Sequence, residues 1–210
     1  MARKLCIGLD FDNTIITYDD VFLAMARAGG LIGADFRGGK REIRDAIRVL
    51  PDGEQCWQQL QGQVYGKGIA DARLFHGVDL FLRRCNREHI PIYIVSHKTE
   101  IGHYDPDRIN LRDAAQHWMT THGFFRGDGY GILPDNVFFE DTRQDKLNRI
   151  ASLGCTQFVD DLEEVLSDPA FPSGVERILL NEGEVASKAV PYIICPTWQH
   201  VEEQIFRART

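Results

Sequence analysis

The sequence predicts an α/β fold in which a parallel sheet is covered by helices on both faces and carries a small helical insertion. Two observations lead to this prediction. Short apolar runs alternate with amphipathic patterns along most of the chain, and one early stretch has no strand signal. Such alternation is typical of parallel sheets with crossover helices. A chain of 210 residues is long enough for one domain with an insertion.

Six short apolar runs are the predicted strands. The first stops abruptly at a polar cluster that begins with Asp10. Continuous apolar runs of this length are typical of strands that are buried on both faces. The predicted strands are residues 4–10, 90–96, 137–140, 156–160, 177–180 and 192–195.

Helical spacing of apolar residues marks the connections and the insertion. Gly123 and Gly154 follow two of the patterns, where a glycine commonly ends a helix. In the glycine-rich stretch from residue 17 to 75, two further patterns predict two or three short helices. We therefore expect a core formed by 1–16 and 76–210, with a helical cap at 17–75. The helical patterns cover residues 78–85, 111–119, 147–151, 43–50 and 57–64.

Composition excludes several classes of protein. The net charge of −7 disfavours a general nucleic-acid binder or a ligand of anionic membranes. No apolar run approaches the length of a membrane span or a signal peptide, so a cytoplasmic protein is expected. The cysteines are odd in number, widely spaced and without a CxxC motif, which predicts reduced thiols and no zinc site. They are Cys6, Cys56, Cys85, Cys155 and Cys195.

Polar residues gather where the predicted strands end. In a parallel sheet these ends share one edge, where ligands bind. Several carboxylates in a small space require a cation, and hard oxygen ligands favour Mg²⁺. A lysine, a serine and the backbone N–H groups of a turn suit a phosphate. The residues are Asp10, Asp12, Asn13 and Thr14 after the first strand, Ser96 and His97 after the second, Lys146 on a later helix, and Asp160 and Asp161.

Each of these residues also has a plainer interpretation. Asp or Asn after a strand is commonly a turn residue, and Asp160 and Asp161 could cap the next helix. Lys146 could lie on a solvated helix face, with Lys98 able to reach the same anion. It is their combination in the order DFDNT, serine, lysine and acidic pair that favours phosphate chemistry.

These four motifs resemble those of the haloacid dehalogenase superfamily of aspartate-nucleophile phosphotransferases. DFDNT at Asp10–Thr14 is similar to the DxDx[TV] motif, followed in family order by Ser96, Lys146 and the pair Asp160–Asp161. The resemblance implies a Rossmann-like core, and the helical insertion is similar to the family's cap. The stretches 103–108 and 124–134 are additions whose shape the family does not predict.

The resemblance also implies roles that the chemistry supports. Asp10 would be the nucleophile that forms an aspartyl-phosphate. Asp12 would be the general acid and then the general base, and its presence favours phosphoryl transfer over dehalogenation. Mg²⁺ would be held by Asp10, the Asp12 carbonyl and Asp160, with Asp161 close by, directly or through water. Asn13, Thr14, Ser96, His97 and Lys146 would bind the phosphoryl group.

The expected function is therefore Mg²⁺-dependent hydrolysis of a small phosphorylated metabolite, such as a sugar phosphate or nucleotide. A phosphomutase uses the same residues and remains an alternative. A phospho-acceptor signalling or binding module is a weaker one, because receiver domains place the acidic pair first and lack a cap. A second anionic group of the substrate could meet basic residues of the cap, although acidic residues interleave with them as on a solvated face. The candidates are Arg27, Arg37, Lys40, Arg41 and Lys67.

Overall fold

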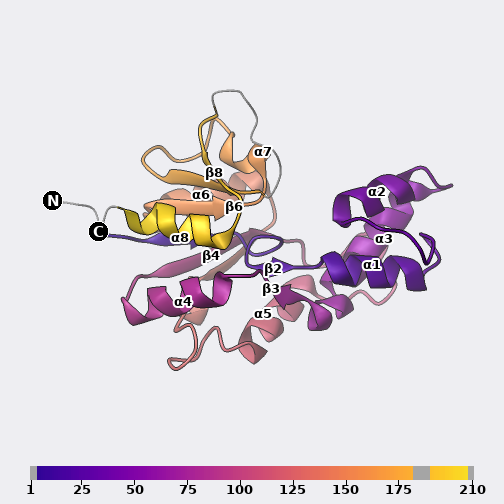
Figure 1. Cartoon of the computed structure of the whole chain (residues 1–210), viewed down its shortest axis with the longest axis horizontal. Coiled ribbons are helices and arrows are strands. Elements are labelled where there is room, and N and C mark those ends of the chain that lie inside the picture. Colours follow the sequence, from indigo (N-terminus) through magenta and orange to yellow (C-terminus); the bar gives the residue numbers. More distant parts are fainter. Residues whose placement is uncertain (1–3, 182–189, 208–210) are drawn as a thin grey trace. The chain divides into compact units, whose positions relative to one another are not determined.

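The computed structural model describes residues 4–181 and 190–207, so predicted core residues 1–3, 182–189 and 208–210 lie outside the described part. The chain divides into two compact units (Figure 1). Unit 1 comprises the described residues of Met1–Ile16, Leu74–His97 and Gly123–Thr210. Unit 2 comprises Thr17–Arg73 and Lys98–His122.

Unit 1 contains a six-stranded sheet in the order β5-β4-β1-β6-β7-β8. All neighbouring strands in this sheet pair in parallel. The six predicted strands are therefore confirmed, with ends that differ by a few residues. The strands are β1 (Ile7–Leu9), β4 (Ile92–His97), β5 (Val137–Glu140), β6 (Gln157–Asp160), β7 (Glu176–Leu180) and β8 (Ile193–Cys195).

Helices cover both faces of this sheet (Figure 1). Crossovers between parallel strands are right-handed, so connections that run in opposite directions across the sheet place their helices on opposite faces. The connection from β1 to β4 carries α4, whereas those from β5 to β6 and from β6 to β7 run the other way and carry α6 and α7. The helices of unit 1 are α4 (Val78–Arg87), α6 (Arg143–Leu153), α7 (Glu163–Leu166), α8 (Trp198–Phe206) and the 3-10 turn η2 (Pro134–Asn136).

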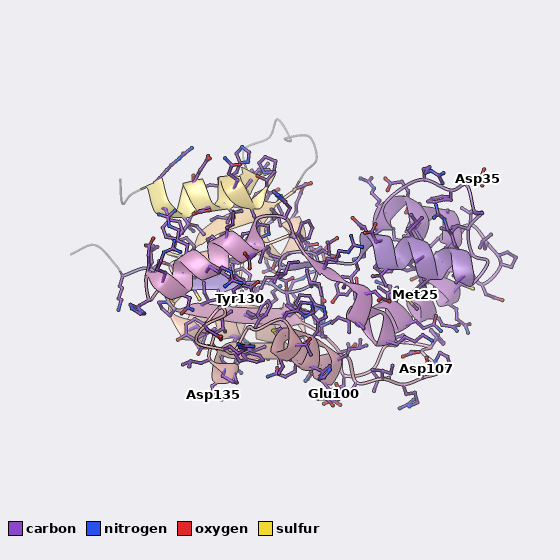
Figure 2. The ribbon with its side chains drawn as sticks, turned by 60° about the horizontal axis from the view of Figure 1, so that its bottom comes forward. Met25, Asp35, Glu100, Asp107, Tyr130 and Asp135 are labelled. Carbon is purple, nitrogen blue, oxygen red and sulfur yellow. The ribbon has the colours of Figure 1, made fainter. Side chains whose placement is uncertain are left out.

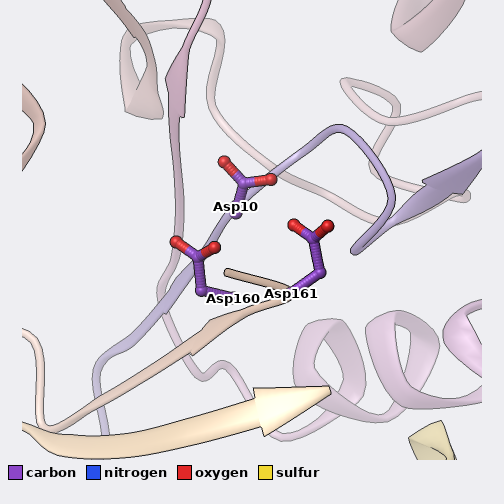
Figure 3. A group of neighbouring side chains, drawn as sticks. All are labelled: Asp10, Asp160 and Asp161. Atoms are coloured by element: carbon purple, nitrogen blue, oxygen red, sulfur yellow. The ribbon is translucent and has the colours of Figure 1, made fainter. Parts of the chain in front are cut away.

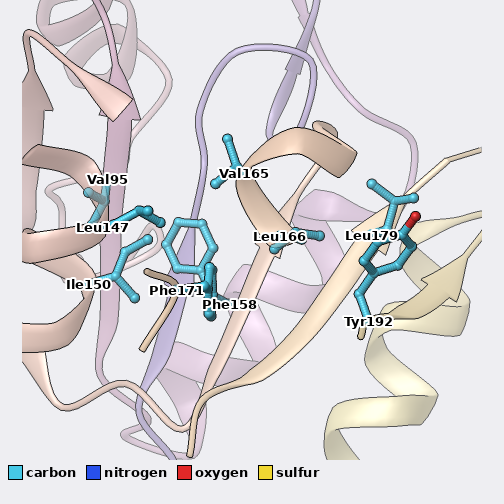
Figure 4. Close-up of a cluster of buried hydrophobic side chains, with 9 residues drawn as sticks. All are labelled: Val95, Leu147, Ile150, Phe158, Val165, Leu166, Phe171, Leu179 and Tyr192. Carbon is cyan, nitrogen blue, oxygen red and sulfur yellow. The ribbon is translucent and has the colours of Figure 1, made fainter. Parts of the chain in front are cut away.

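The core between the sheet and the α6–α7 face is a cluster of buried apolar side chains (Figure 4). Strand residues on one side of the pleat point toward these helices because side chains alternate along a strand. Burial of this apolar surface stabilises the sheet from which the polar strand ends project. The cluster consists of Val95, Leu147, Ile150, Phe158, Val165, Leu166, Phe171, Leu179 and Tyr192.

Gly8 lies in β1 where another side chain leaves no room for a Cβ atom. A Cβ at this position would lie 2.5 Å from the ring of Phe158, which is fully buried. We expect Gly8→Ala to lower the free energy of unfolding by about 1–3 kcal/mol, because the ring must shift within a packed core. Urea denaturation measures this, with Gly127→Ala as control, since a Cβ there meets nothing within 4 Å. Equal stability of the two variants would contradict the prediction.

The glycine-rich addition at 124–134 is a loop held against α4. The hydroxyl of Tyr130, labelled in Figure 2, donates to Asp79 Oδ1 at 2.8 Å. The amide of Asn86 donates to the carbonyls of Gly127 and Gly129 at 3.1 and 3.0 Å. These bonds connect the loop to a helix of unit 1.

Unit 2 is helical and has its own aromatic core. Phe22 stacks on Trp57 with ring centroids 5.3 Å apart, and the edge of Tyr18 meets Tyr65 at 4.8 Å. The indole N–H of Trp118 donates to the carbonyl of Ala72 at 3.3 Å. The helices are α1 (Asp19–Ala28), α2 (Lys40–Arg48), α3 (Gly53–Tyr65), η1 (Lys67–Asp71) and α5 (Leu111–Thr121).

Unit 2 includes a longer part of the chain than the predicted cap does. The segment 98–122 packs with 17–73 in one compact unit, although the sequence had suggested only 17–75. The cap boundaries therefore stay a prediction. The stretch 17–75 has no strand signal in the sequence, yet two short strands, β2 (Ile16–Thr17) and β3 (Arg73–Leu74), lie at its ends and form a two-stranded sheet. Strands of two residues are too short to produce a hydrophobic period.

Two predictions from composition concern membranes and thiols. Within residues 4–181 and 190–207, every helix is too short or too polar to cross a membrane. No disulfide joins the five cysteines, all of which lie in the described part of the chain. Burial raises the pKa of Cys85 to about 12 and that of Cys195 to about 11, so both thiols stay protonated at neutral pH.

Candidate active site

Two carboxyl-bearing strand ends meet at the middle of the sheet. β1 lies between β4 and β6, with Leu9 paired to Val159, and the N–H of Asp10 donates to the Val159 carbonyl at 2.9 Å. The chain leaves β1 toward one edge of the sheet and leaves β6 toward the other. The crevice at such a topological switch point is where ligands bind in open α/β sheets.

Three carboxylates converge at these strand ends. Asp10, Asp160 and Asp161 each offer an oxygen atom, and these atoms all lie within 4.8 Å of one another (Figure 3). Asp10 and Asp160 are buried, and Asp161 is half-buried. The N–H of Leu162 donates to Asp160 Oδ1 at 3.0 Å and fixes that carboxylate. The predicted convergence of the first and fourth motifs is therefore present in the structure.

Lys146, the residue of the third motif, contacts this group of carboxylates. Its Nζ donates to Asp10 Oδ1 and to Asp160 Oδ2, each at 2.7 Å, and its side chain is 1% exposed. The first turn of α6 holds it there, because Thr142 Oγ1 accepts a hydrogen bond from the N–H of Asp145 at 3.1 Å. Lys146 thus lies in the interior and not on a solvated helix face.

Burial and neighbouring charges oppose each other in this cluster. Burial raises the pKa of Asp10 to about 7, opposed by the charge of Lys146 and reinforced by those of Asp160 and Asp12. For Lys146, burial lowers the pKa, but the charges of Asp10 and Asp160 outweigh it and hold the pKa above its ordinary value. Three carboxylates against one ammonium leave an excess of negative charge, which a divalent cation would neutralise.

The turn after Asp10 places further residues of the first motif at the same edge. The hydroxyl of Thr14 donates to Asp161 Oδ1 through a long bond of 3.4 Å. Asn13 has a positive φ of 59°, and its N–H donates to the carbonyl of Ile16 at 2.8 Å. Since that donor is engaged within the turn, phosphate binding by Asn13 stays a prediction. Asp12 is half-buried in the same turn.

Sequence reasoning assigned no role to Trp198, which contacts this turn. Its indole N–H donates to the carbonyl oxygen of Thr14 at 2.9 Å. The two residues are 184 positions apart, so no local pattern could have connected them. Only the packing of α8 against the rest of unit 1 brings them together.

Ser96 and His97 lie at the end of β4. Ser96 is buried and pairs with Phe139 of β5, whereas His97 is exposed. The Nε2 atom of His97 lies 2.9 Å from the carbonyl oxygen of Asp141, to which it can only donate. Their roles in phosphate binding stay predictions.

The other basic candidates belong to unit 2. Lys98 is buried there, with Nζ 5.1 Å from the ring centroid of Tyr65. Lys40 Nζ lies 5.5 Å from the same centroid. Lys67 bonds to Asp107, labelled in Figure 2, at 2.8 Å. Lys146, in contrast, bonds directly to Asp10.

Comparison with known proteins identifies the fold. No protein-family model matches the chain, and no curated protein matches its sequence. Solved structures do match. A HAD family hydrolase from Deinococcus radiodurans with bound phosphate and sodium has a TM-score of 0.59 at 11% identity, over 98% of this chain and 96% of that chain.

Two further structures agree. A predicted phosphoglycolate phosphatase from Haemophilus somnus has a TM-score of 0.55 at 13% identity, over 97% of this chain and 99% of its own. Protein Tyrosine Kinase A from Mycobacterium tuberculosis has a TM-score of 0.63 at 14% identity, over 97% and 99%. The chain therefore has the haloacid dehalogenase-like fold, as its motifs indicated.

Proposed function

We propose that this protein is a Mg²⁺-dependent phosphomonoester hydrolase that works through an aspartyl-phosphate on Asp10. The observation that carries the proposal is the buried bridge from Lys146 to Asp10 and Asp160, next to Asp161. This arrangement suits the transfer of an anionic phosphoryl group. It combines a buried nucleophile, a positively charged hydrogen-bond donor beside it and an excess of carboxylates.

The carboxylate group fits a divalent cation. Its donors are hard oxygen atoms from Asp10, Asp160 and Asp161, the ligand type that Mg²⁺ prefers. We propose that these residues and the Asp12 carbonyl hold the ion, with Asp161 acting directly or through water. When bound, Mg²⁺ neutralises charge between the nucleophile and the phosphoryl oxygens.

The residues of the first motif would then divide the reaction into two displacements. An oxygen of Asp10 attacks phosphorus as the bond to the leaving oxygen breaks, and Asp12 gives its proton to that oxygen. In the second step Asp12 takes a proton from water, whose oxygen attacks phosphorus and releases Asp10. Lys146 favours the charged form of Asp10 and, with Ser96, Thr14, Asn13 and His97, binds phosphoryl oxygens.

Similarity of fold supports this proposal without deciding it. The structures with this fold include a hydrolase with bound phosphate, a predicted phosphatase and a protein named as a kinase. One fold can serve different reactions, so the proposal rests on the residues around Asp10.

We further propose a small cytoplasmic substrate, such as a sugar phosphate or nucleotide. The net charge of −7 disfavours polyanionic polymers.

Phosphate release from a panel of small phosphomonoesters and one aryl phosphate tests the proposal. We expect turnover in Mg²⁺ that falls to background in EDTA and returns when Mg²⁺ is restored, because the ion screens Asp10 from the phosphoryl oxygens. Chromatography of the products separates the alternatives, since a mutase yields an isomer and a hydrolase yields inorganic phosphate. Turnover that persists unchanged in EDTA would contradict the proposal.

A further inference from the structure

We propose that Trp198 is a positioning residue for the metal site, acting from the C-terminal helix through the turn that follows Asp10. The inference rests on the proposed function, because it assigns Trp198 a role in holding the cation that this function requires. It adds a residue outside the four motifs, from a helix that contributes none of their side chains.

The contact between Trp198 and the turn is direct and buried. The indole N–H donates to the carbonyl oxygen of Thr14 at 2.9 Å, and the Trp198 side chain is 1% exposed. Thr14 is itself fully buried. A hydrogen bond in such an environment is costly to lose, because the carbonyl would remain buried without a partner.

The helix that carries Trp198 is itself held firmly. The ring of Trp198 packs against Phe81 of α4 with centroids 5.0 Å apart. One turn further along α8, Glu202 accepts a hydrogen bond from Arg84 at 2.7 Å. The guanidinium of Arg84 also lies 3.7 Å from the ring centroid of Phe206. The indole therefore donates from a rigid position.

The effect of this bond reaches the carboxylates through Thr14. Its carbonyl is held by Trp198, and its hydroxyl donates to Asp161 Oδ1 at 3.4 Å. Because both bonds come from one buried residue, release of the carbonyl lets the hydroxyl move away from Asp161. The oxygen of Asp161 would then leave its place within 4.8 Å of those of Asp10 and Asp160.

The test compares two tryptophan variants that each lose one buried N–H donor. Trp198→Phe keeps an aromatic ring but removes the bond to Thr14, and Trp118→Phe removes the bond to Ala72 in unit 2. Residues that support a metal ligand typically change affinity 10- to 100-fold, so we expect Trp198→Phe to weaken cation binding about tenfold. Trp118→Phe should bind as the wild type does. Calorimetry with Mg²⁺, or paramagnetic resonance with Mn²⁺ alone, measures the affinity without substrate.

A double-mutant cycle distinguishes positioning from general loosening of the fold. Thr14→Val removes the hydroxyl and keeps the carbonyl, whereas Thr14→Ser retains both. If Trp198 acts through Thr14, Trp198→Phe should change the Mg²⁺ affinity much less in the Thr14→Val protein than in the wild type. Thr14→Ser, unlike Thr14→Val, should keep most of the wild-type affinity for Mg²⁺. Urea denaturation in EDTA identifies any variant that has not folded. If Trp198→Phe is one of them, the same cycle is run with Trp198→Leu, which also lacks the indole N–H.

The outcomes separate the two proposals. If the wild type binds the cation and Trp198→Phe binds it equally well, the positioning role is wrong and the proposed function stands. Additive effects of Trp198→Phe and Thr14→Val would also overturn the role. A wild type that binds neither Mg²⁺ nor Mn²⁺ would overturn the proposed function, and the inference with it.

Discussion

Asp10→Asn is expected to lower kcat for phosphate release by about four orders of magnitude or more, because an amide cannot attack phosphorus. The change is nearly isosteric, so the substrate-binding residues should keep their places. Steady-state kinetics on the best phosphomonoester of the panel, in saturating Mg²⁺, measures the loss. Residual activity within tenfold of the wild type would show that Asp10 is not the nucleophile.

The same variant has a stability signature that shows it is folded. The pKa of Asp10 is raised to about 7 from 3.8, so the folded state binds this proton more tightly than the unfolded state. Stability from the protonated carboxyl is then present at low pH and lost as the pH rises from about 4 to about 7. Asparagine cannot ionise. In EDTA, Asp10→Asn should therefore lose less stability than the wild type across this range, as urea denaturation would show.

Lys146→Met is expected to lower the free energy of unfolding of the metal-free protein by about 3–5 kcal/mol, since it leaves buried carboxylates without their cation. In the wild type, the Nζ of Lys146 donates to both Asp10 and Asp160 at 2.7 Å. Loss of this ammonium should also reduce kcat by about 10²–10³, because a fixed donor to the phosphoryl group is removed. Urea denaturation in EDTA and steady-state kinetics in Mg²⁺ give the two values.

Arg143→Met is the matched control, because Arg143 lies on the same helix and its ion pair is exposed. The Nη2 atom of Arg143 lies 2.8 Å from Oε1 of Glu164, and the two side chains are 45% and 62% exposed. Such pairs contribute about 0–1 kcal/mol. A Lys146→Met protein as stable as Arg143→Met would mean that Lys146 does not offset the charges of Asp10 and Asp160. Mg²⁺ should restore part of the stability of Lys146→Met, since binding to the folded state shifts the equilibrium.

The strands and the residues at their ends could be predicted because each depends on local pattern. The run that ends at Leu9 and the cluster that begins at Asp10 are adjacent in sequence, and a parallel sheet brings such ends to one edge. Lys146 was identified through its place in the order of motifs. Its burial could not be predicted, since lysine most often lies at the surface.

The sequence by itself determined the class of fold and the position of the acidic clusters, because hydrophobic period and turn chemistry act over a few residues. Tertiary structure decided which distant groups meet. It placed Lys146 between Asp10 and Asp160, packed 98–122 with 17–73, and brought Trp198 to Thr14. These contacts depend on how whole helices dock on the sheet and on one another, and side chains far apart in the chain leave no periodic signal of such docking.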